Sequence, residues 1–337
     1  MENTHTEELE NMTSRKPQEH AADNTPHDGL AGYEALKNGV AIVDRSGRSV
    51  LRLAGKDPVG MLDAVLTNQV PKEPTLGIYA ALLSPKGKIQ TDLRALKSGK
   101  EVLVDTEPEG AAAAREILGR YAPFSRVKIE DLSTGDEFWG VLGLYGPRAG
   151  ELLGGLRLVE HESADVGVGG ARLLASSVAV PVSGFDLLGP VDELRAARDY
   201  LLQAGAVLAG SDAYETARVE AGTPRFGSDI TPDNFPAETG ILERAVSFSK
   251  GCYPGQETVA RMHYRGHPNR TLCRLVVKGS SPTPDTPIFQ NEKQVGRITS
   301  VAPLPVGSHQ LVLAYLSRNA DLDNALHAGD AQLRPVA

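Results

Sequence analysis

Paired short apolar segments joined by turn sequences, with amphipathic helices between the pairs, most constrain how this chain can fold. Residues 39–44 and 48–53 are separated by Arg-Ser-Gly, and residues 77–83 and 88–96 by Ser-Pro-Lys-Gly. Each pair predicts a β-hairpin. Because hairpin-linked strands are antiparallel, the pattern favours an α+β fold over a doubly wound parallel sheet.

Helix signals lie between these strands. In residues 56–68, Asp57 suits the N-cap and Pro58 suits the first helical position. An amphipathic stretch that ends at Gly205 fits a left-handed helix stop. Asp212 and Glu215 have capping-box spacing at the start of a further helix. The sequence therefore predicts helices at 56–68, near 108–121, 148–153, 191–205 and 211–222.

The pattern changes after residue 270. Short apolar segments then recur at regular spacing, which is typical of a small all-β barrel. A chain of 337 residues is also too long for one small core. We expect an acidic disordered tail (1–28), a first α+β subdomain (29–146), a second α+β subdomain (147–265) and a C-terminal β-barrel (266–337).

Composition excludes several classes of protein. The net charge of −8 and the aromatic content of 5% argue against broad nucleic-acid binding. Two cysteines, Cys252 and Cys273, cannot form a disulfide framework or hold a stable zinc ion or iron–sulfur cluster alone. No apolar run reaches 18 residues and the start lacks a secretory signal. We expect a cytoplasmic protein with no membrane span and no stable metal, present as a monomer.

Glu220 falls in the last turn of the helix predicted at 211–222, where the helix dipole disfavours an anion. The carboxylate could face water or pair with Arg218 or Arg225. Alternatively, it faces inward and accepts hydrogen bonds from N–H groups of a ligand, which a buried carboxylate requires. The next segment, residues 222–230, is an irregular loop in which Arg225 and Asp229 either form a structural ion pair or line a cleft.

The segment Ser-Lys-Gly-Cys-Tyr-Pro-Gly-Gln-Glu spans residues 249–257. Pro254 suits the first turn of a helix over about 254–263. Cys252 would then lie at a helix N-terminus beside Lys250, and both features stabilise a thiolate. The alternative is a small buried cysteine, with Gln256 and Glu257 capping backbone N–H groups.

Basic residues concentrate between 250 and 278, with Glu257 as the one acid. They are either separate solvated side chains or a site for phosphates or carboxylates, such as RNA or a glutamate tail. Cys273 and Trp139 fall in strand patterns and are predicted to be core residues. The basic patch that we expect consists of Arg261, Arg265 and Arg270.

Residues 250–257, KGCYPGQE, resemble the signature of the YgfZ family, folate-binding proteins related to the T-protein aminomethyltransferase of the glycine cleavage system. The resemblance extends over about residues 33–317. It includes RLAGKDPVGMLDAVLTNQV (52–70), YAALLSPKGKIQTDL (79–93), RVEAGTPRFGSDI (218–230), VARMHYRGHPNRTL (259–272) and VGRITSVA (295–302).

The resemblance implies three subdomains around a central folate channel. Glu220 matches the glutamate that holds the pteridine ring, and Asp92 matches a carboxylate near the folate nitrogens. Arg225 lies in the same matching block as Glu220 and is expected to contact folate. The signature residues are Lys250, Gly251, Cys252, Tyr253, Gly255, Gln256 and Glu257.

Three functions follow as hypotheses. The first is a tetrahydrofolate-binding protein that assists iron–sulfur cluster assembly or repair, including in radical tRNA-modifying enzymes. Cys252, activated by Lys250, would then contact a cluster transiently. The second is a folate-dependent aminomethyltransferase or methyltransferase with Asp92 as its acid or base. The third is a module that binds tRNA through the basic patch.

Overall fold

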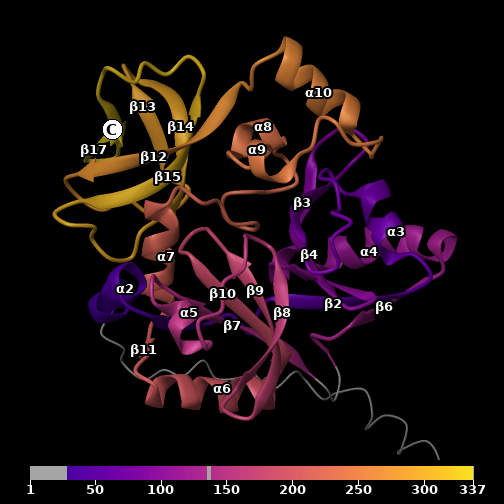
Figure 1. Ribbon diagram of the computed structural model, residues 1–337. Coiled ribbons are helices and arrows are strands. Elements are labelled where there is room, and N and C mark those ends of the chain that lie inside the picture. The colour runs from indigo at the N-terminus through magenta and orange to yellow at the C-terminus, as the bar shows by residue number, and fades with distance from the viewer. Residues whose placement is uncertain (1–28, 135–137, 337) are drawn as a thin grey trace, which may run out of the picture.

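The computed structural model describes residues 29–134 and 138–336, and the predicted tail, residues 1–28, lies outside this part. The described chain forms a five-stranded sheet, a six-stranded sheet and a closed barrel (Figure 1). The barrel lies at the upper left of that view, the six-stranded sheet below it, and the five-stranded sheet at the right. The predicted α+β class with a C-terminal barrel is confirmed.

The five-stranded sheet carries helices α3 and α4 on one face. Asp57 caps α3 as predicted, because its Oδ1 accepts the Gly60 N–H at 2.8 Å. Leu53, Leu62 and Leu118 belong to the buried cluster between sheet and helices. The sheet has the order β3 (Ile78–Leu83), β4 (Ile89–Ser98), β5 (Glu101–Thr106), β2 (Ser49–Gly55), β6 (Val127–Asp131), and its helices are α3 (Pro58–Val65) and α4 (Pro108–Ser125).

The six-stranded sheet is assembled from distant parts of the chain. Its order is β11 (Val207–Leu208), β1 (Ala41–Asp44), β7 (Trp139–Tyr145), β10 (Gly184–Pro190), β9 (Ala171–Val178), β8 (Ser163–Val168). Leu194 and Leu201 of α6 (Val191–Gln203) pack into its core, and Gly205 ends that helix region with a φ of 98°. Helices α2 (Gly29–Asn38), α5 (Ala149–Leu152) and α7 (Ser211–Glu220) complete this unit.

The hairpin predicted from residues 39–44 and 48–53 is wrong. Strand β1 pairs with β7 and β11, whereas β2 pairs with β5 and β6 of the other sheet. A tight turn does occur, since the Arg48 N–H donates to the Arg45 carbonyl at 3.0 Å. However, both edges of β1 are occupied by strands from later in the chain, so this turn carries the chain from one sheet to the other.

The predicted boundary at residue 146 does not separate the two sheets. Strands β1 and β7 lie before this boundary, yet both belong to the six-stranded sheet with β8, β9 and β10. The five-stranded sheet is thus an insertion between two strands of the other sheet. Chain order alone suggested consecutive units because the pattern marks strands but not their partners.

The barrel closes in the order β12 (Arg270–Lys278), β15 (Gln310–Ser317), β14 (Lys293–Val301), β13 (Pro287–Gln290), β16 (Leu326–Ala328), β17 (Ala331–Pro335). Asp229, fully buried in the loop after α7, links the barrel to the rest of the protein. Its carboxylate pairs with Arg218 at 2.7 Å and accepts hydrogen bonds from the hydroxyls of Thr299 and Ser300. Half-buried Cys273 packs against the barrel core, and half-buried Trp139 against a separate cluster between the sheets.

Residues 236–265 connect α7 to the barrel through α8 (Pro236–Thr239), α9 (Leu242–Ala245) and α10 (Gln256–Arg265). Helix α10 begins two residues later than predicted, after Gly255. The predicted capping box of α7 is also wrong. Glu215 pairs instead with Arg218 on the same helix and with Arg225 in the following loop, so its carboxylate does not cap the backbone.

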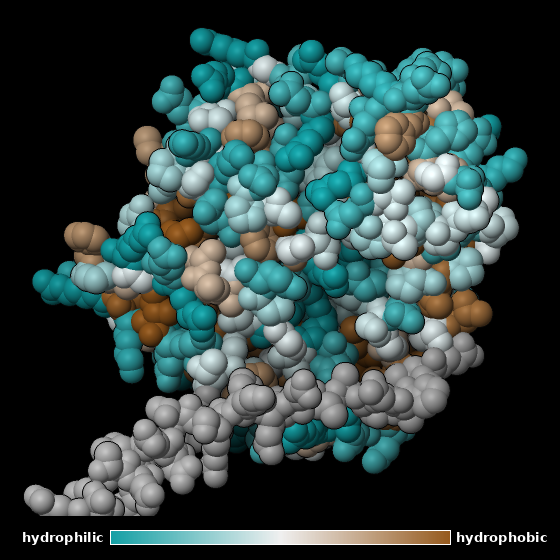
Figure 2. All heavy atoms as spheres, turned by 180° about the vertical axis from the view of Figure 1, so that it is seen from behind, coloured by the Kyte–Doolittle hydropathy of each residue, from teal (hydrophilic) through white to brown (hydrophobic). Residues whose placement is uncertain are grey.

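Hydrophilic residues predominate on the face seen in Figure 2, and its hydrophobic residues form separate spots. No helix in the described ranges is long and apolar enough to cross a membrane.

Candidate functional site

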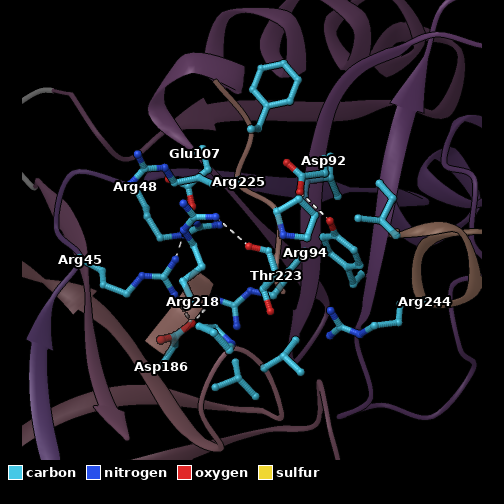
Figure 3. A pocket seen from close by; sticks show the side chains of 18 of the residues that line it. Arg45, Arg48, Asp92, Arg94, Glu107, Asp186, Arg218, Thr223, Arg225 and Arg244 are labelled. Carbon is cyan, nitrogen blue, oxygen red and sulfur yellow. Dashed lines mark hydrogen bonds and ion pairs between the residues drawn. The ribbon is translucent and has the colours of Figure 1, made fainter. Parts of the chain in front are cut away.

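A cavity of about 110 Å³ lies where the two sheets meet the loop after α7. Side chains from β4 and β10, from the turn between β1 and β2, and from residues 223–226 line it. In Figure 3 the side chains of Arg45, Arg48 and Arg94 lie close to the carboxylates of Glu107 and Asp186. The cavity therefore combines several charged side chains with apolar wall residues such as Val180, Phe226 and Ile241.

Buried ion pairs hold one end of the cavity together. Arg94 Nε donates to Asp105 at 2.9 Å, and the same guanidinium reaches Asp186 of the other sheet at 2.5 Å. Burial alone would raise the pKa of Asp105, but the charges of Arg48 and Arg94 outweigh it and hold that pKa well below its usual range. The full network joins Arg45, Arg48, Arg94, Asp105, Glu107, Asp186 and Tyr145.

One donor of this network has no hydrogen-bond partner in the part of the chain that the structure describes. Arg94 Nη1 is buried and makes no hydrogen bond within the described residues, while the other two guanidinium nitrogens are bound. Burying an unpaired polar group costs about 1–3 kcal/mol. An unpaired donor on a cavity wall is therefore a candidate ligand contact.

Asp92, a predicted site residue, lines the cavity. Tyr79 donates its phenolic hydrogen to Asp92 Oδ2 at 2.6 Å. Burial raises the pKa of Asp92 to about 6, and the Tyr79 hydrogen bond opposes this rise only in part. A carboxyl group with this pKa can both give and take a proton near neutral pH.

His161 also lines the cavity, and sequence reasoning missed it. It lies in the loop before β8 with a φ of 67°, which is uncommon for a residue other than glycine. Its Nδ1 is buried without a partner in the described chain. Burial lowers the pKa of His161 to about 4, so the ring is neutral at pH 7. No local motif marks His161; only the pairing of distant strands brings it here.

Arg225, also predicted as a site residue, lines the cavity and is partly exposed. It pairs with Glu215 at 2.9 Å. The predicted alternative of an Arg225–Asp229 ion pair is wrong, because Arg218 holds the Asp229 carboxylate and Arg225 reaches it only through its backbone N–H. Arg244 adds a second partly exposed cation to the lining, paired with Glu160 at 2.5 Å.

Glu220, predicted to bind the pteridine ring, is not among the residues that line the cavity. Its carboxylate accepts hydrogen bonds from Tyr33 and Lys37 of α2, each at 2.7 Å. Burial opposes ionisation of Glu220, but these two bonds outweigh it and lower its pKa. The predicted pairing of Glu220 with Arg218 or Arg225 is therefore wrong, because its partners Tyr33 and Lys37 lie on α2. Binding of the pteridine ring by Glu220 stays a prediction.

The signature residues also lie outside the lining of the cavity. Lys250 is buried, and its ammonium donates to the backbone carbonyls of Asp63 and Leu66. Tyr253 packs in a buried cluster, and Gly255 has a φ of 81°. Gly251 and Glu257 are exposed and Gln256 is half-buried. The segment is therefore anchored through Lys250, Tyr253 and Gly255.

The structure leaves no room for a side chain at position 255. A Cβ there would lie 2.5 Å from the Ser84 carbonyl oxygen and 2.8 Å from Gly87 Cα. Ser84 and Gly87 belong to the turn between β3 and β4. The glycine thus permits the signature segment to pack directly on the hairpin that carries Tyr79 and Asp92.

Cys252 is a free and exposed thiol. It precedes α10 by four residues, so the prediction that it lies at the helix N-terminus is wrong. Lys250 directs its ammonium to two carbonyl groups instead. Activation of the thiol by Lys250 stays a prediction. No cluster of three or more His, Cys, Asp or Glu side chains suited to a metal ion occurs in the part of the chain that the structure describes.

The predicted basic patch divides in two. Arg261 and Arg265 are exposed on α10. Arg270 instead pairs with Glu238 at 3.2 Å, and its guanidinium lies 5.0 Å from the centre of the Tyr315 ring. Binding of tRNA by this patch stays a prediction, now resting on Arg261 and Arg265.

Comparison with known proteins identifies the family. The chain is 27% identical over 314 residues to a putative chloroplastic transferase of Arabidopsis thaliana, covering 88% of this chain and 70% of that protein. It is 27% identical over 308 residues to an aminomethyltransferase of Moorella thermoacetica, covering 85% and 80%. Its fold matches the glycine cleavage system aminomethyltransferase T of Bartonella henselae with a TM-score of 0.77 and 20% identity, covering 90% and 86%.

A family profile agrees with these similarities. The profile described as the GCVT N-terminal domain matches residues 15–250, more than half of the chain. The chain therefore belongs to the GCVT N-terminal domain family.

Proposed function

We propose that this chain binds a tetrahydrofolate derivative and that the cavity holds its pteridine ring. The observation that carries the proposal is Asp92, whose buried carboxyl lines the cavity with a pKa of about 6. A pteridine ring is flat, apolar on its faces and rich in N–H groups and ring nitrogens at its edge. A carboxyl group that can accept or donate a hydrogen bond suits that edge.

The charges around the cavity support the same ligand. The pteridine end needs donors and acceptors, which Arg94 Nη1 and Asp92 supply. The glutamate end of a folate carries carboxylates, and partly exposed Arg225 and Arg244 suit them. The residues present therefore fit both ends of a folate.

Calorimetry with 5-formyltetrahydrofolate tests the proposal. Asp92→Asn keeps the shape but removes the charge, and should weaken binding by about 10- to 100-fold, the effect of one charge-assisted hydrogen bond. Exposed Asp165 on β8 provides the matched control, and Asp165→Asn should bind like the unmodified protein. Absence of binding by the unmodified protein would refute the proposal.

For the chemistry, we favour a folate-dependent one-carbon transferase of the aminomethyltransferase type. The Moorella relative bears the name aminomethyltransferase and the Arabidopsis relative the name putative transferase. Asp92 is the candidate acid or base. Incubation with a lipoyl-bound aminomethyl donor and tetrahydrofolate should yield methylene-tetrahydrofolate, and Asp92→Asn should abolish the product. A folate-binding protein that yields no product would contradict transferase activity.

A second candidate function is assistance to iron–sulfur proteins, as the resemblance of residues 250–257 to the YgfZ signature suggests. One observation favours it: Cys252 is exposed on an anchored segment outside the cavity, where another protein can reach it. A cytoplasmic client, such as a radical tRNA-modifying enzyme, would lose activity in a Cys252→Ser strain under oxidative stress. Normal activity of such enzymes in that strain would exclude a role for the thiol.

A further inference from the structure

Helix α10 presents a largely exposed face at the upper edge of the molecule in Figure 1. Among its ten residues only Val259 is buried. Tyr264 is 67% exposed, and Arg261, His263 and Arg265 are exposed as well. Large aromatic and charged side chains that gather on one open face mark a surface that can bind a partner.

Three aromatic rings pack together on this face. The His263 ring lies on the Phe248 ring, with centroids 4.0 Å apart and an angle of 18° between the planes. Tyr264 packs edge-on against both, at 5.7 Å from Phe248 and 4.7 Å from His263. Phe248 is half-buried against the core cluster that holds Tyr253. The two exposed rings therefore rest on a fixed base and offer flat surfaces to a ligand.

The two arginines of this face are not neutralised. Arg261 and Arg265 are spaced i, i+4, where like charges repel, and neither forms an ion pair within the described ranges. On helix α6, by contrast, Arg195 pairs with Asp192 at 2.8 Å. The α10 face thus keeps a local positive charge for an anionic partner, although the whole chain has a net charge of −8.

Close packing fixes the start of the helix. A Cβ on Gly87 would lie 2.8 Å from Thr258 Cβ, so α10 rests on the turn between β3 and β4. Lys86, the residue before Gly87, is exposed in this turn and adds a third cation. A surface that is already ordered loses little conformational freedom when a partner binds.

Cations beside exposed, stacked rings are complementary to a single-stranded nucleic acid, whose phosphates bind the cations while its bases stack on the rings. An acidic protein would satisfy the arginines but would leave the ring faces without a flat partner. The ring nitrogens of His263 form no hydrogen bond with other described residues and can bind a 2′-hydroxyl group, which distinguishes RNA from DNA.

We propose that the α10 surface, formed by Phe248, Arg261, His263, Tyr264 and Arg265, binds unpaired RNA. A base stacks on the rings of Tyr264 and His263, and phosphates bind Arg261 and Arg265. This inference goes beyond the proposed function and does not depend on it, because none of these residues lines the cavity.

Fluorescence anisotropy with a labelled oligouridylate of about twelve nucleotides tests the surface. Its affinity should fall about ten-fold between about 50 and 200 mM salt, as expected for two or three phosphate contacts on a single strand. The corresponding DNA should bind at least about three-fold more weakly, because it lacks the 2′-hydroxyl groups. A duplex RNA of the same length should bind at least about ten-fold more weakly, because its bases stay stacked on one another.

Variants of the exposed side chains separate stacking from charge. Tyr264→Ala should weaken RNA binding about 5- to 150-fold, whereas Tyr264→Phe keeps the ring and should retain most of the affinity. Arg261→Gln combined with Arg265→Gln should reduce the slope of log K against log salt by about 1.4. Tyr200→Ala and Arg195→Gln change the same residue types on α6, at the lower edge of Figure 1, and should leave binding unchanged.

Each contrary result overturns a stated part of the inference. Absence of RNA binding at low salt overturns the whole proposal, while folate binding is measured independently. Unchanged affinity of Tyr264→Ala, with thermal unfolding confirming that the variant is folded, overturns base stacking. Equal affinity for the DNA overturns the assignment of RNA, and equal affinity for a polyglutamate of the same charge overturns it in favour of an acidic protein.

Discussion

Replacing Lys250 by methionine should destabilise the protein, because this lysine acts as an anchor within the signature segment. Its side chain is 1% exposed, and the ammonium donates to the carbonyls of Asp63 and Leu66. Methionine fills a similar volume but cannot donate, so two buried acceptors lose their partner. Each unpaired acceptor costs about 1–3 kcal/mol.

Part of that loss is offset, because burying an ammonium group is itself unfavourable. Burial lowers the pKa of Lys250, which reflects this cost. A net loss of about 3 kcal/mol in the free energy of unfolding is the expected result. It corresponds to a fall in Tm of roughly 5–10 °C.

Urea unfolding followed through the fluorescence of Trp139, the one tryptophan of the sequence, measures the change. Exposed Lys278 supplies the control, and Lys278→Met should stay within about 0.5 kcal/mol of the unmodified protein. The rate at which Cys252 reacts with a thiol reagent is measured in parallel, in a Cys273→Ala background. Full stability of Lys250→Met combined with a slower thiol reaction would refute the anchoring role and favour activation of Cys252.

Three further predictions concern other parts of the structure. As the pH rises from 4 to 6, Asp92 should lower the free energy of unfolding by up to about 3 kcal/mol, because its raised pKa makes the folded state hold the proton more tightly than the unfolded chain does. Urea unfolding across this range measures the fall, which should be absent in Asp92→Asn. Gly255→Ala should cost about 1–3 kcal/mol more than Gly222→Ala in thermal unfolding, since both glycines have positive φ but only Gly255 is crowded by backbone; equal costs would contradict the packing argument. Asp229→Ala should lower the free energy of unfolding, measured in urea, by about 3–5 kcal/mol, because Arg218, whose side chain is 4% exposed, loses its buried partner. A loss below about 1 kcal/mol would contradict the role of Asp229 as the link to the barrel.

Features set by nearest neighbours were predictable from the sequence. Asp57 and Pro58 begin α3, and Gly205 and Gly222 follow their helices with positive φ. The regular spacing of strands after residue 270 correctly predicted the barrel. These signals are local, because a cap, a turn or an alternating strand is stabilised mainly by residues a few positions away.

Features set by distant partners were not predictable from patterns. The sequence pattern of an apolar strand such as β1 is the same whether the strand pairs with β2 or with β7. Likewise, a glutamate at a helix end gives no sign that its partner will be Lys37, 183 positions earlier. His161 lies in an unremarkable stretch, and only the meeting of Gly77 with its loop places it in the cavity. Resemblance to a family pointed to Asp92, which lies on the cavity wall, because a matching block carries tertiary information that spacing does not; its role in binding or catalysis stays a prediction.

The anchoring of the signature segment indicates a structural role for several of its residues. Lys250 is bound to the chain just after α3, and Gly255 packs on the turn between β3 and β4. Those two strands carry Tyr79 and Asp92, so the segment braces the hairpin that presents the cavity carboxyl. A substitution at Gly255 should therefore disturb ligand binding without contacting the ligand, whereas Cys252, whose side chain is exposed, should be replaceable with no such effect. Comparison of Gly255→Ala with Cys252→Ser by calorimetry thus separates the bracing role of the segment from any chemistry of its thiol.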